Sequence, residues 1–297
     1  SVNLRGASGE ITIFHNSKKI GTRDIPAGYY QLHQNGIYHF NKKNYQVESI
    51  IKTQNGANAY LKKSDEIQKR TIPIVKTSLT QVSEKKSIKK EIDSTTTKIT
   101  LRYGLIDMNR TITGYLKGNY NDSADKFETI NGDSISTWNN FNWNSKHYCT
   151  SIFIPSEFGT KIKSDVKNSI VTDSKIHTIT HVLVNASKIL TKSESNDIDA
   201  YYENGIIHLF DNTSDGYNGC SKMIYENFEE IMKTCFDLVN ECDCPVDPKQ
   251  KKAVSEGEEW GGCPKCTFTT NYCQTKNKKL SKNEALEFFS IFKREIK

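Results

Sequence analysis

The chain has 297 residues, of which 35% are hydrophobic, and this is enough to build one large core or two smaller ones. Its 6 prolines and 17 glycines exclude a collagen-like or proline-rich disordered chain, and the absence of a long apolar run excludes a membrane-spanning helix, so we expect no membrane partner. The net charge of +6 is compatible with contacts to nucleic-acid phosphates, and equally with a lysine-rich solvated surface.

Residues 1–75 are predicted to form an all-β segment. Asn35-Gly36 and Asn55-Gly56 supply the residue types that tight turns with positive φ require. A small meander or barrel is therefore expected here. Its β-prone runs are residues 11–14, 29–33, 37–40 and 45–51.

Residues 76–97 change in character. The run Lys85–Lys90 and the run Ser94–Thr97 are polar, with little to bury, which predicts an exposed insertion or linker. An extended, β-type region is expected to follow over residues 98–170.

Residues 171–297 are predicted to form an α+β domain. Apolar residues recur at helical spacing over 176–190 and 220–241, and a capping box from Ser281 to Glu284 begins a last helix. Asn204-Gly205 predicts a hairpin between residues 198–203 and 206–210. The fold class is therefore α+β, with a β-rich N-terminal segment followed by this domain.

Cysteine placement gives the strongest chemical signal. Seven of the eight cysteines fall between Cys220 and Cys273, in a chain without secretory features, which indicates metal binding in a reducing compartment, the cytoplasm or the nucleus. Zinc takes four thiolates in a tetrahedron, and a Cys-x-x-Cys turn supplies two of them. The sequence predicts a structural zinc. Its candidate ligands are Cys242, Cys244, Cys263, Cys266 and Cys273, five residues for four positions, with Cys242 or Cys273 as the spare.

Three other features have weaker functional interpretations. His177 and His181 have a spacing that could hold a metal, but bonding within a packed helix face is favoured. The loop from Asp211 to Gly219 could cradle a phosphate at a helix N-terminus, but a structural turn is favoured. Cys149 is interpreted as a buried thiol, as is Cys220.

Motifs for ATP hydrolysis are absent. The sequence has no Gly-x-x-x-x-Gly-Lys-Ser/Thr and no Asp-Glu-x-His box. We expect no ATP hydrolysis and no catalytic residue in this chain alone.

The C-terminal third resembles the four-cysteine zinc domain at the end of superfamily 2 DNA helicases of the mitomycin-repair and RecQ4-like family. The resemblance covers about residues 174–292, and a weaker one covers Asn3–Gly6, 32–38 and 44–47. The matching residues are His177 and His181, Phe210-Asp211, Gly216 and Gly219, Cys242-Asp243-Cys244-Pro245, Gly262-Cys263-Pro264-Lys265-Cys266, Cys273, Asn277, Leu280, Lys282 and Ala285.

The resemblance implies a non-catalytic C-terminal region of an ATP-dependent helicase in DNA repair, whose motor domains act in cis or in trans. An alternative is a free-standing accessory subunit of an anti-phage defence system that works with a separate helicase. A third possibility is a protein-interaction module with no DNA contact. The residues before Ser1 would distinguish the first two, and salt-dependent binding would test the third.

DNA contact is expected from lysines that alternate with aromatic residues, as in Tyr38–Lys43 and Tyr272–Lys279. Lysines neutralise phosphates, and exposed rings stack on unpaired bases. We therefore predict binding to single-stranded or forked DNA. The candidate DNA-binding residues are Lys276, Lys278 and Lys279.

Overall fold

The computed structural model divides the chain into two compact units, Ser1–Gln81 with Asp107–Lys146, and Val82–Ile106 with His147–Lys297. We call these unit 1 and unit 2. The structure describes residues 9–25, 27–93, 98–122, 126–138, 141–154, 174–194, 197–213, 216–242, 244, 263, 265–269, 280 and 282–293. For residues 80–93, 98, 174, 175, 292 and 293 the description is confined to the backbone.

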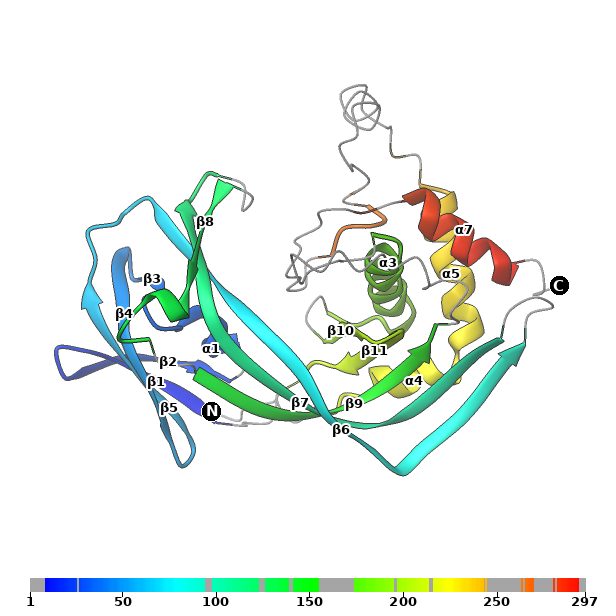
Figure 1. Ribbon diagram of the computed structural model, residues 1–297, viewed down its shortest axis with the longest axis horizontal. Coiled ribbons are helices and arrows are strands. Elements are labelled where there is room, and N and C mark those ends of the chain that lie inside the picture. The colour runs from blue at the N-terminus through cyan, green and yellow to red at the C-terminus, as the bar shows by residue number, and fades with distance from the viewer. Residues whose placement is uncertain are drawn as a thin grey trace. The chain divides into compact units, whose positions relative to one another are not determined.

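Unit 1 contains a five-stranded sheet in the order β2-β1-β5-β4-β3 (Figure 1). Strands β1 and β5 pair in parallel, whereas the β1–β2, β4–β5 and β3–β4 pairs are antiparallel. The strands are β1 Glu10–His15, β2 Lys18–Asp24, β3 Ile37–Phe40, β4 Lys43–Thr53 and β5 Gly56–Lys63, and the helix α1 Ala27–Gln31 follows β2.

One face of this sheet is buried, and strand alternation places every second side chain on the other, more exposed face. Ile11 and Ile13 of β1 lie opposite Ala57 and Ala59 of β5, and all four are buried. They pack with residues of α1, β6, β7 and β9 in the core of unit 1. Thr12, Asn58 and the other alternate residues therefore face away from that core. The prediction of a β-rich N-terminal segment is confirmed.

The prediction of a β-type run at residues 29–33 is wrong. These residues begin in the helix α1, where the Leu32 N–H donates to the Gly28 carbonyl at 2.8 Å. Tyr29 in the helix is buried, as are Leu32 and His33, which follow its end. Tyr29 and Tyr30 are residues that favour strands, but in so short a segment this preference cannot distinguish a strand from a helical turn.

The second sheet has six strands in the order β10-β11-β9-β7-β6, with β8 paired to β7. Strands β6, β7 and β9 each contain residues of both units. Its strands are β6 Lys69–Asp93, β7 Lys98–Asn119, β8 Glu128–Asn131, β9 Phe141–Phe153, β10 Ile198–Glu203 and β11 Ile206–Asp211, and the short helix η2 Gly132–Ser134 follows β8.

Within the segment predicted as a polar insertion or linker, 76–97, residues 76–93 continue strand β6, which was not predicted from the sequence. Residues 94–97 lie outside the described part of the chain. Strand β7 is the hydrogen-bonded neighbour of β6. Ladder hydrogen bonds satisfy the backbone whatever side chains the strand carries, so a polar sequence does not exclude a strand.

The core of unit 2 forms where helices pack against β9, β10 and β11 (Figure 1). Helix α3 contacts β10, α5 and α7, and helix α4 contacts β11. Ile179 and Leu183 of α3, Ile231 of α5 and Phe289 of α7 are almost completely buried in this core. The helices are α3 Ser174–Thr191, α4 Cys220–Glu226, α5 Phe228–Asn240 and α7 Lys282–Lys293.

The structure divides the helix predicted over residues 220–241. Helix α4 ends at Glu226 and α5 begins at Phe228, with Asn227 between them at φ −116°. The Asn227 N–H still donates to the Met223 carbonyl at 3.0 Å. Both segments bury apolar residues, among them Ile224 and Phe228, so apolar spacing alone does not reveal the break.

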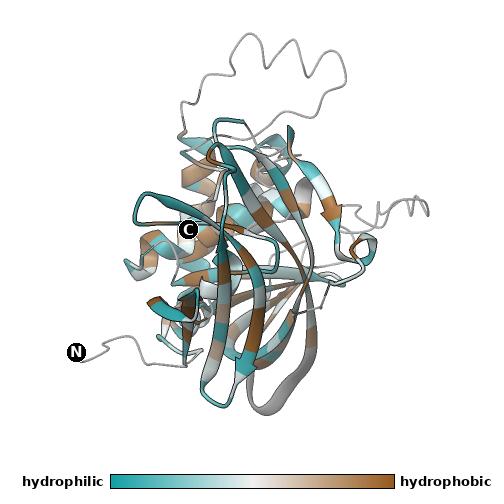
Figure 2. Ribbon diagram, turned by 90° about the vertical axis from the view of Figure 1, so that its left-hand side faces the viewer, coloured by the Kyte–Doolittle hydropathy of each residue, from teal (hydrophilic) through white to brown (hydrophobic). Residues whose placement is uncertain are grey.

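The fold class is α+β, as predicted from the sequence, with a four-cysteine cluster in unit 2. Hydrophobic and hydrophilic residues alternate in short bands along strands and helices (Figure 2). Among the residues that the structure describes, no helix combines the length and hydropathy needed to cross a membrane.

Candidate metal centre

Four cysteine sulfurs converge beyond the C-terminal end of α5. The Sγ atoms of Cys242, Cys244, Cys263 and Cys266 all lie within 4.8 Å of one another. The Cys242 and Cys263 sulfurs are 3.7 Å apart. Four Zn–S bonds in a tetrahedron place the sulfurs about 3.8 Å apart. The donor set and its spacing therefore fit one tetrahedral zinc ion.

A tight turn presents the second cysteine pair. The Cys263 carbonyl accepts hydrogen bonds from the N–H groups of Cys266, Thr267 and Phe268 at 3.3, 3.0 and 2.9 Å. The Lys265 N–H donates to the Cys263 sulfur at 3.3 Å, and the Cys263 N–H donates to the Thr267 hydroxyl at 2.7 Å. These bonds aim both sulfurs inward, and they supply the N–H donor that a zinc-bound thiolate needs.

Helix α3 holds this turn through two polar side chains. The Nδ1–H of His181 donates to the Thr267 carbonyl at 3.0 Å. The Asn185 amide donates to the carbonyls of Cys266 and Phe268 at 3.3 and 2.8 Å. His181 and Asn185 are four residues apart, so both lie on one face of α3. The helix thereby fixes the position of the second cysteine pair.

Lys282, the first residue of α7, holds the other cysteine pair. Its Nζ donates to the Cys242 carbonyl at 2.8 Å and lies 3.1 Å from the Cys244 sulfur. An ammonium group at this distance favours the thiolate over the thiol. The centre thus contacts α3 on one side and α7 on the other, so it connects elements far apart in the sequence.

The thiols of the cluster differ in acidity. Burial acts to raise the pKa of Cys263, but hydrogen bonds from Lys265 and Cys266, and from the Cys244 thiol, lower this pKa to about 7. Burial raises the pKa of Cys244 and of Cys266. One thiolate therefore forms easily near neutral pH, and a divalent cation displaces the remaining protons when it binds.

Of the sequence-predicted ligands, Cys242, Cys244, Cys263 and Cys266 come together, and Cys273 lies outside the described residues. The predicted DNA-binding lysines, Lys276, Lys278 and Lys279, also lie outside them. Sequence reasoning missed the supporting role of Asn185. The available signal was its position four residues after His181, which is itself four residues after His177.

The histidine pair is part of a packed helix face. His177 and His181 are both buried, and their ring centroids lie 4.3 Å apart in an edge-to-face arrangement. Because His181 donates to the Thr267 carbonyl, it supports the cysteine turn rather than serving as one of the clustered ligands.

The turn after β11 is filled by a carboxylate of the chain itself. Asp211 is fully buried, and its oxygens accept hydrogen bonds from the N–H groups of Asn218, Gly219 and Ser221 at 3.0, 3.1 and 2.6 Å. Burial raises the pKa of Asp211, and these donors oppose the rise. Since Asp211 occupies the N-terminus of α4, the structural interpretation of this turn is favoured over a phosphate cradle.

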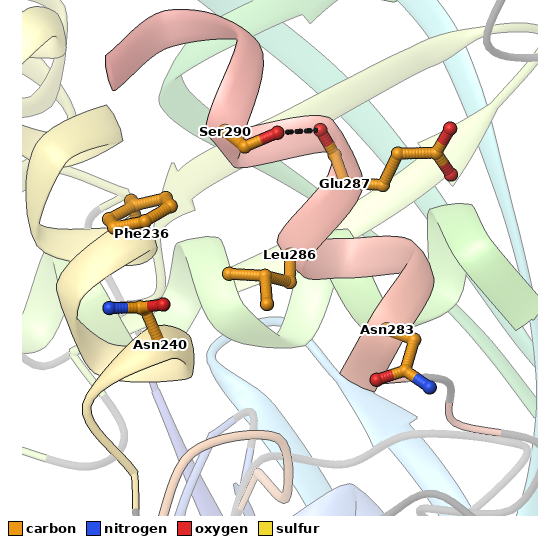
Figure 3. Close-up of a pocket in the computed structure, with 6 residues that line it drawn as sticks. All are labelled: Phe236, Asn240, Asn283, Leu286, Glu287 and Ser290. Atoms are coloured by element: carbon orange, nitrogen blue, oxygen red, sulfur yellow. Dashed lines mark hydrogen bonds between the residues drawn. The ribbon is translucent and has the colours of Figure 1, made fainter. Parts of the chain in front are cut away.

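The remaining candidates carry no catalytic arrangement. Burial raises the pKa of Cys149 to about 12 and also raises that of Cys220, so neither thiol is activated. A hollow of about 470 Å³ lies between α5 and α7 (Figure 3). Its lining includes Phe236, Leu286 and one carboxylate, Glu287, without a histidine or cysteine, so it offers no general acid–base pair.

Comparison with protein families identifies the segment around the centre. Residues 179–267 match the MrfA Zn-binding domain. The match begins in α3, ends in the cysteine turn and includes all four clustered cysteines, so it confirms the predicted resemblance and a structural zinc site.

Solved structures provide a second comparison. A crystal structure of the DUF1998 helicase MrfA bound to DNA is similar at a TM-score of 0.55 and 17% identity, over 96% of this chain and 34% of that chain. A second crystal structure, of MrfA bound to DNA and AMPPNP, is similar at a TM-score of 0.49 and 18% identity, over 97% of this chain and 32% of that chain. The first shows a shared fold, and this chain spans about a third of the helicase's length. No curated protein matches the chain.

Proposed function

We propose that this chain is the non-catalytic C-terminal region of an ATP-dependent superfamily 2 DNA helicase that acts in DNA repair. In this proposal it contacts single-stranded or forked DNA and supports motor domains in cis or in trans, in the cytoplasm or nucleus. The observation that carries the proposal is the four-cysteine centre inside a segment that matches the MrfA Zn-binding domain. The shared fold with a helicase solved on DNA also supports it.

Cys242, Cys244, Cys263 and Cys266 are the proposed zinc ligands. With four thiolates the ion has no open position for water or substrate, which is the arrangement of structural zinc sites. When bound, zinc cross-links the end of α5 to the cysteine turn. His181 and Asn185 hold the carbonyls of that turn, and Lys282 holds the Cys242 carbonyl, so the protein orients the ligands before the metal binds.

The DNA part of the proposal rests on charge. The net charge is +6, and Lys276, Lys278 and Lys279 lie close together in the sequence just before α7. Each lysine that neutralises a phosphate releases counterions, so affinity falls with rising salt concentration. Binding through these lysines is expected to be independent of DNA sequence, because phosphate contacts carry no base information.

The test is titration of single-stranded and forked DNA at several salt concentrations. Joint replacement of Lys276, Lys278 and Lys279 by alanine should flatten the log–log salt slope by about 2, at roughly 0.7 per lost contact on single strands. The matched control replaces Lys146, Lys222 and Lys233, three exposed lysines whose removal changes the net charge equally. No binding by the unmodified chain at low salt would contradict the proposed DNA contact, and equal slopes in the two variants would contradict the lysine assignment.

A further inference from the structure

The more exposed face of the five-stranded sheet in unit 1 presents an aromatic pair. Phe14 of β1 lies opposite Tyr60 of β5, and their rings stack with centroids 5.5 Å apart and an interplanar angle of 19°. Ile13 and Leu61, the sequence neighbours of this pair, are buried in the unit 1 core. Because side chains alternate along a strand, the Phe14–Tyr60 pair faces away from that core.

Part of this aromatic surface is accessible. Tyr60 is 36% exposed, and Ile51 of β4, in the adjacent register row, is 54% exposed. Two large side chains are therefore accessible in adjoining rows of one sheet face. A ring with one face packed against a second ring, as Tyr60 is against Phe14, offers its other face to another planar group.

Lysines lie near the Phe14–Tyr60 pair. Lys19 of β2 is opposite Phe14 in the register, so Lys19, Phe14 and Tyr60 form a row across three strands. Lys62 is two residues after Tyr60 on β5 and therefore lies on the same face. Both lysines are exposed. A ligand stacked on Tyr60 would have one positive charge across the strands, at Lys19, and another along β5, at Lys62.

One carboxylate, Glu48, adjoins this row. The row is completed by Ser49, opposite Tyr60, and the adjacent row consists of Thr22, Thr12, Asn58 and Ile51. These rows, all of whose residues are described, contain no carboxylate. Glu10 and Asp24 pair with each other at the far end of β1, and Glu48 sits at the bulge of β4. Lys19 and Lys62 outnumber the single carboxylate at this end, Glu48, so the local charge favours an anionic ligand there.

We propose that this face binds single-stranded DNA, with one unpaired base stacked on Tyr60 and the adjoining phosphates at Lys19 and Lys62. An exposed ring with lysines nearby matches a planar base carried on an anionic backbone. A duplex does not fit this role, because its bases are already stacked on one another. The inference rests on the proposed DNA contact and adds to it a second site, in the other unit from Cys242–Cys266.

The experiment uses the full chain and a single strand of about 12 nucleotides, within the site sizes of single-strand-binding folds. The strand contains 2-aminopurine, whose fluorescence falls when the base stacks. Tyr60→Ala should weaken binding by about 5- to 100-fold and restore the fluorescence of the bound strand. Tyr60→Phe keeps the ring and should behave like the unmodified chain. The control is Tyr217→Ala, which removes a 50% exposed tyrosine from unit 2.

The charge prediction is tested in the same assay. Joint replacement of Lys19 and Lys62 by alanine should flatten the salt slope by roughly 1.4, for two contacts on a single strand. Replacement of Lys222 and Lys233 is the matched control. Near-native circular dichroism and melting of each variant would show that the sheet is intact.

The outcomes separate this site from the proposed function. If the unmodified chain binds the strand and Tyr60→Ala binds it equally well with equal quenching, the sheet-face site is overturned while the general DNA contact stands. If the unmodified chain binds no DNA at low salt, both are overturned. If Tyr60→Ala weakens duplex binding as much as single-strand binding, base stacking is wrong.

Discussion

At the scale of single residues, Asn185 connects the zinc centre to the core of unit 2. Its amide reaches two carbonyls of the cysteine turn, at Cys266 and Phe268. Asn185→Ala should leave the zinc stoichiometry unchanged but weaken zinc binding by about 10-fold or more, because supporting groups of this kind typically contribute that much. The measurement is zinc release to a competing chelator.

The matched control for this variant is Asn240→Ala, which removes an exposed amide from the end of α5. Zinc release at the native rate from Asn185→Ala would contradict the supporting role. Complete loss of zinc would instead place Asn185 among the determinants of folding.

Protonation of His208 makes the free energy of unfolding depend on pH. Burial lowers the pKa of His208 from 6.5 to about 4, and its Nδ1 contacts the Ser151 hydroxyl at 2.8 Å. The unfolded chain therefore binds more protons than the folded chain below about pH 6.5. The contribution of His208 to the free energy of unfolding is complete above about pH 6.5. It falls by up to about 3 kcal/mol as the pH decreases towards 4.

On acidification from about pH 7 to about pH 5, the free energy of unfolding should decrease less in His208→Gln than in the unmodified chain. Urea unfolding at both pH values measures the difference, and His39→Gln, at an exposed histidine, is the control. Zinc loss in acid affects all three proteins alike, so it cancels in the comparison. Identical pH dependence in His208→Gln and the unmodified chain would show that His208 does not titrate as described.

At the scale of secondary-structure elements, Asp211 joins strand β11 to helix α4. Its carboxylate accepts three backbone N–H bonds at the turn before α4, where Gly219 adopts φ +84°. Asp211→Asn should lower the free energy of unfolding by about 2–3 kcal/mol, since the loss of a charged acceptor leaves buried donors poorly satisfied.

Chemical denaturation measures this change, and Asp237→Asn on α5 is the control. The melting temperature of Asp211→Asn should also be unaffected by added phosphate. An unchanged unfolding free energy, or stabilisation by phosphate, would contradict the assignment of Asp211 as the anion that fills this turn.

Elements with strong local signals could be predicted from the sequence, and those fixed by distant partners could not. The helix expected over 176–190 is α3, and Asn204-Gly205 joins β10 to β11. The strand β6 was missed because its pairing with β7, and not its polar composition, determines its conformation. The same holds at the metal centre. The spacing of the cysteines predicted them as metal ligands, whereas the contacts that Asn185 and Lys282 make to the centre depend on tertiary structure.

At the scale of the whole molecule, the two units have separate hydrophobic cores. The four clustered cysteines all belong to unit 2, and they join the end of α5 to a turn held by α3. In sites of this kind the free energy of metal binding contributes directly to folding. The structural role of zinc is therefore the central claim, and it concerns unit 2.

Metal analysis of the freshly purified chain tests that claim most directly. We predict one tightly bound zinc ion per chain, and loss of that zinc together with lower thermal stability in Cys266→Ser. Cys235→Ser is the control, since Cys235 is a buried thiol outside the cluster. A chain purified without zinc, a disulfide between Cys263 and Cys266, or unchanged zinc content and melting in Cys266→Ser would contradict it.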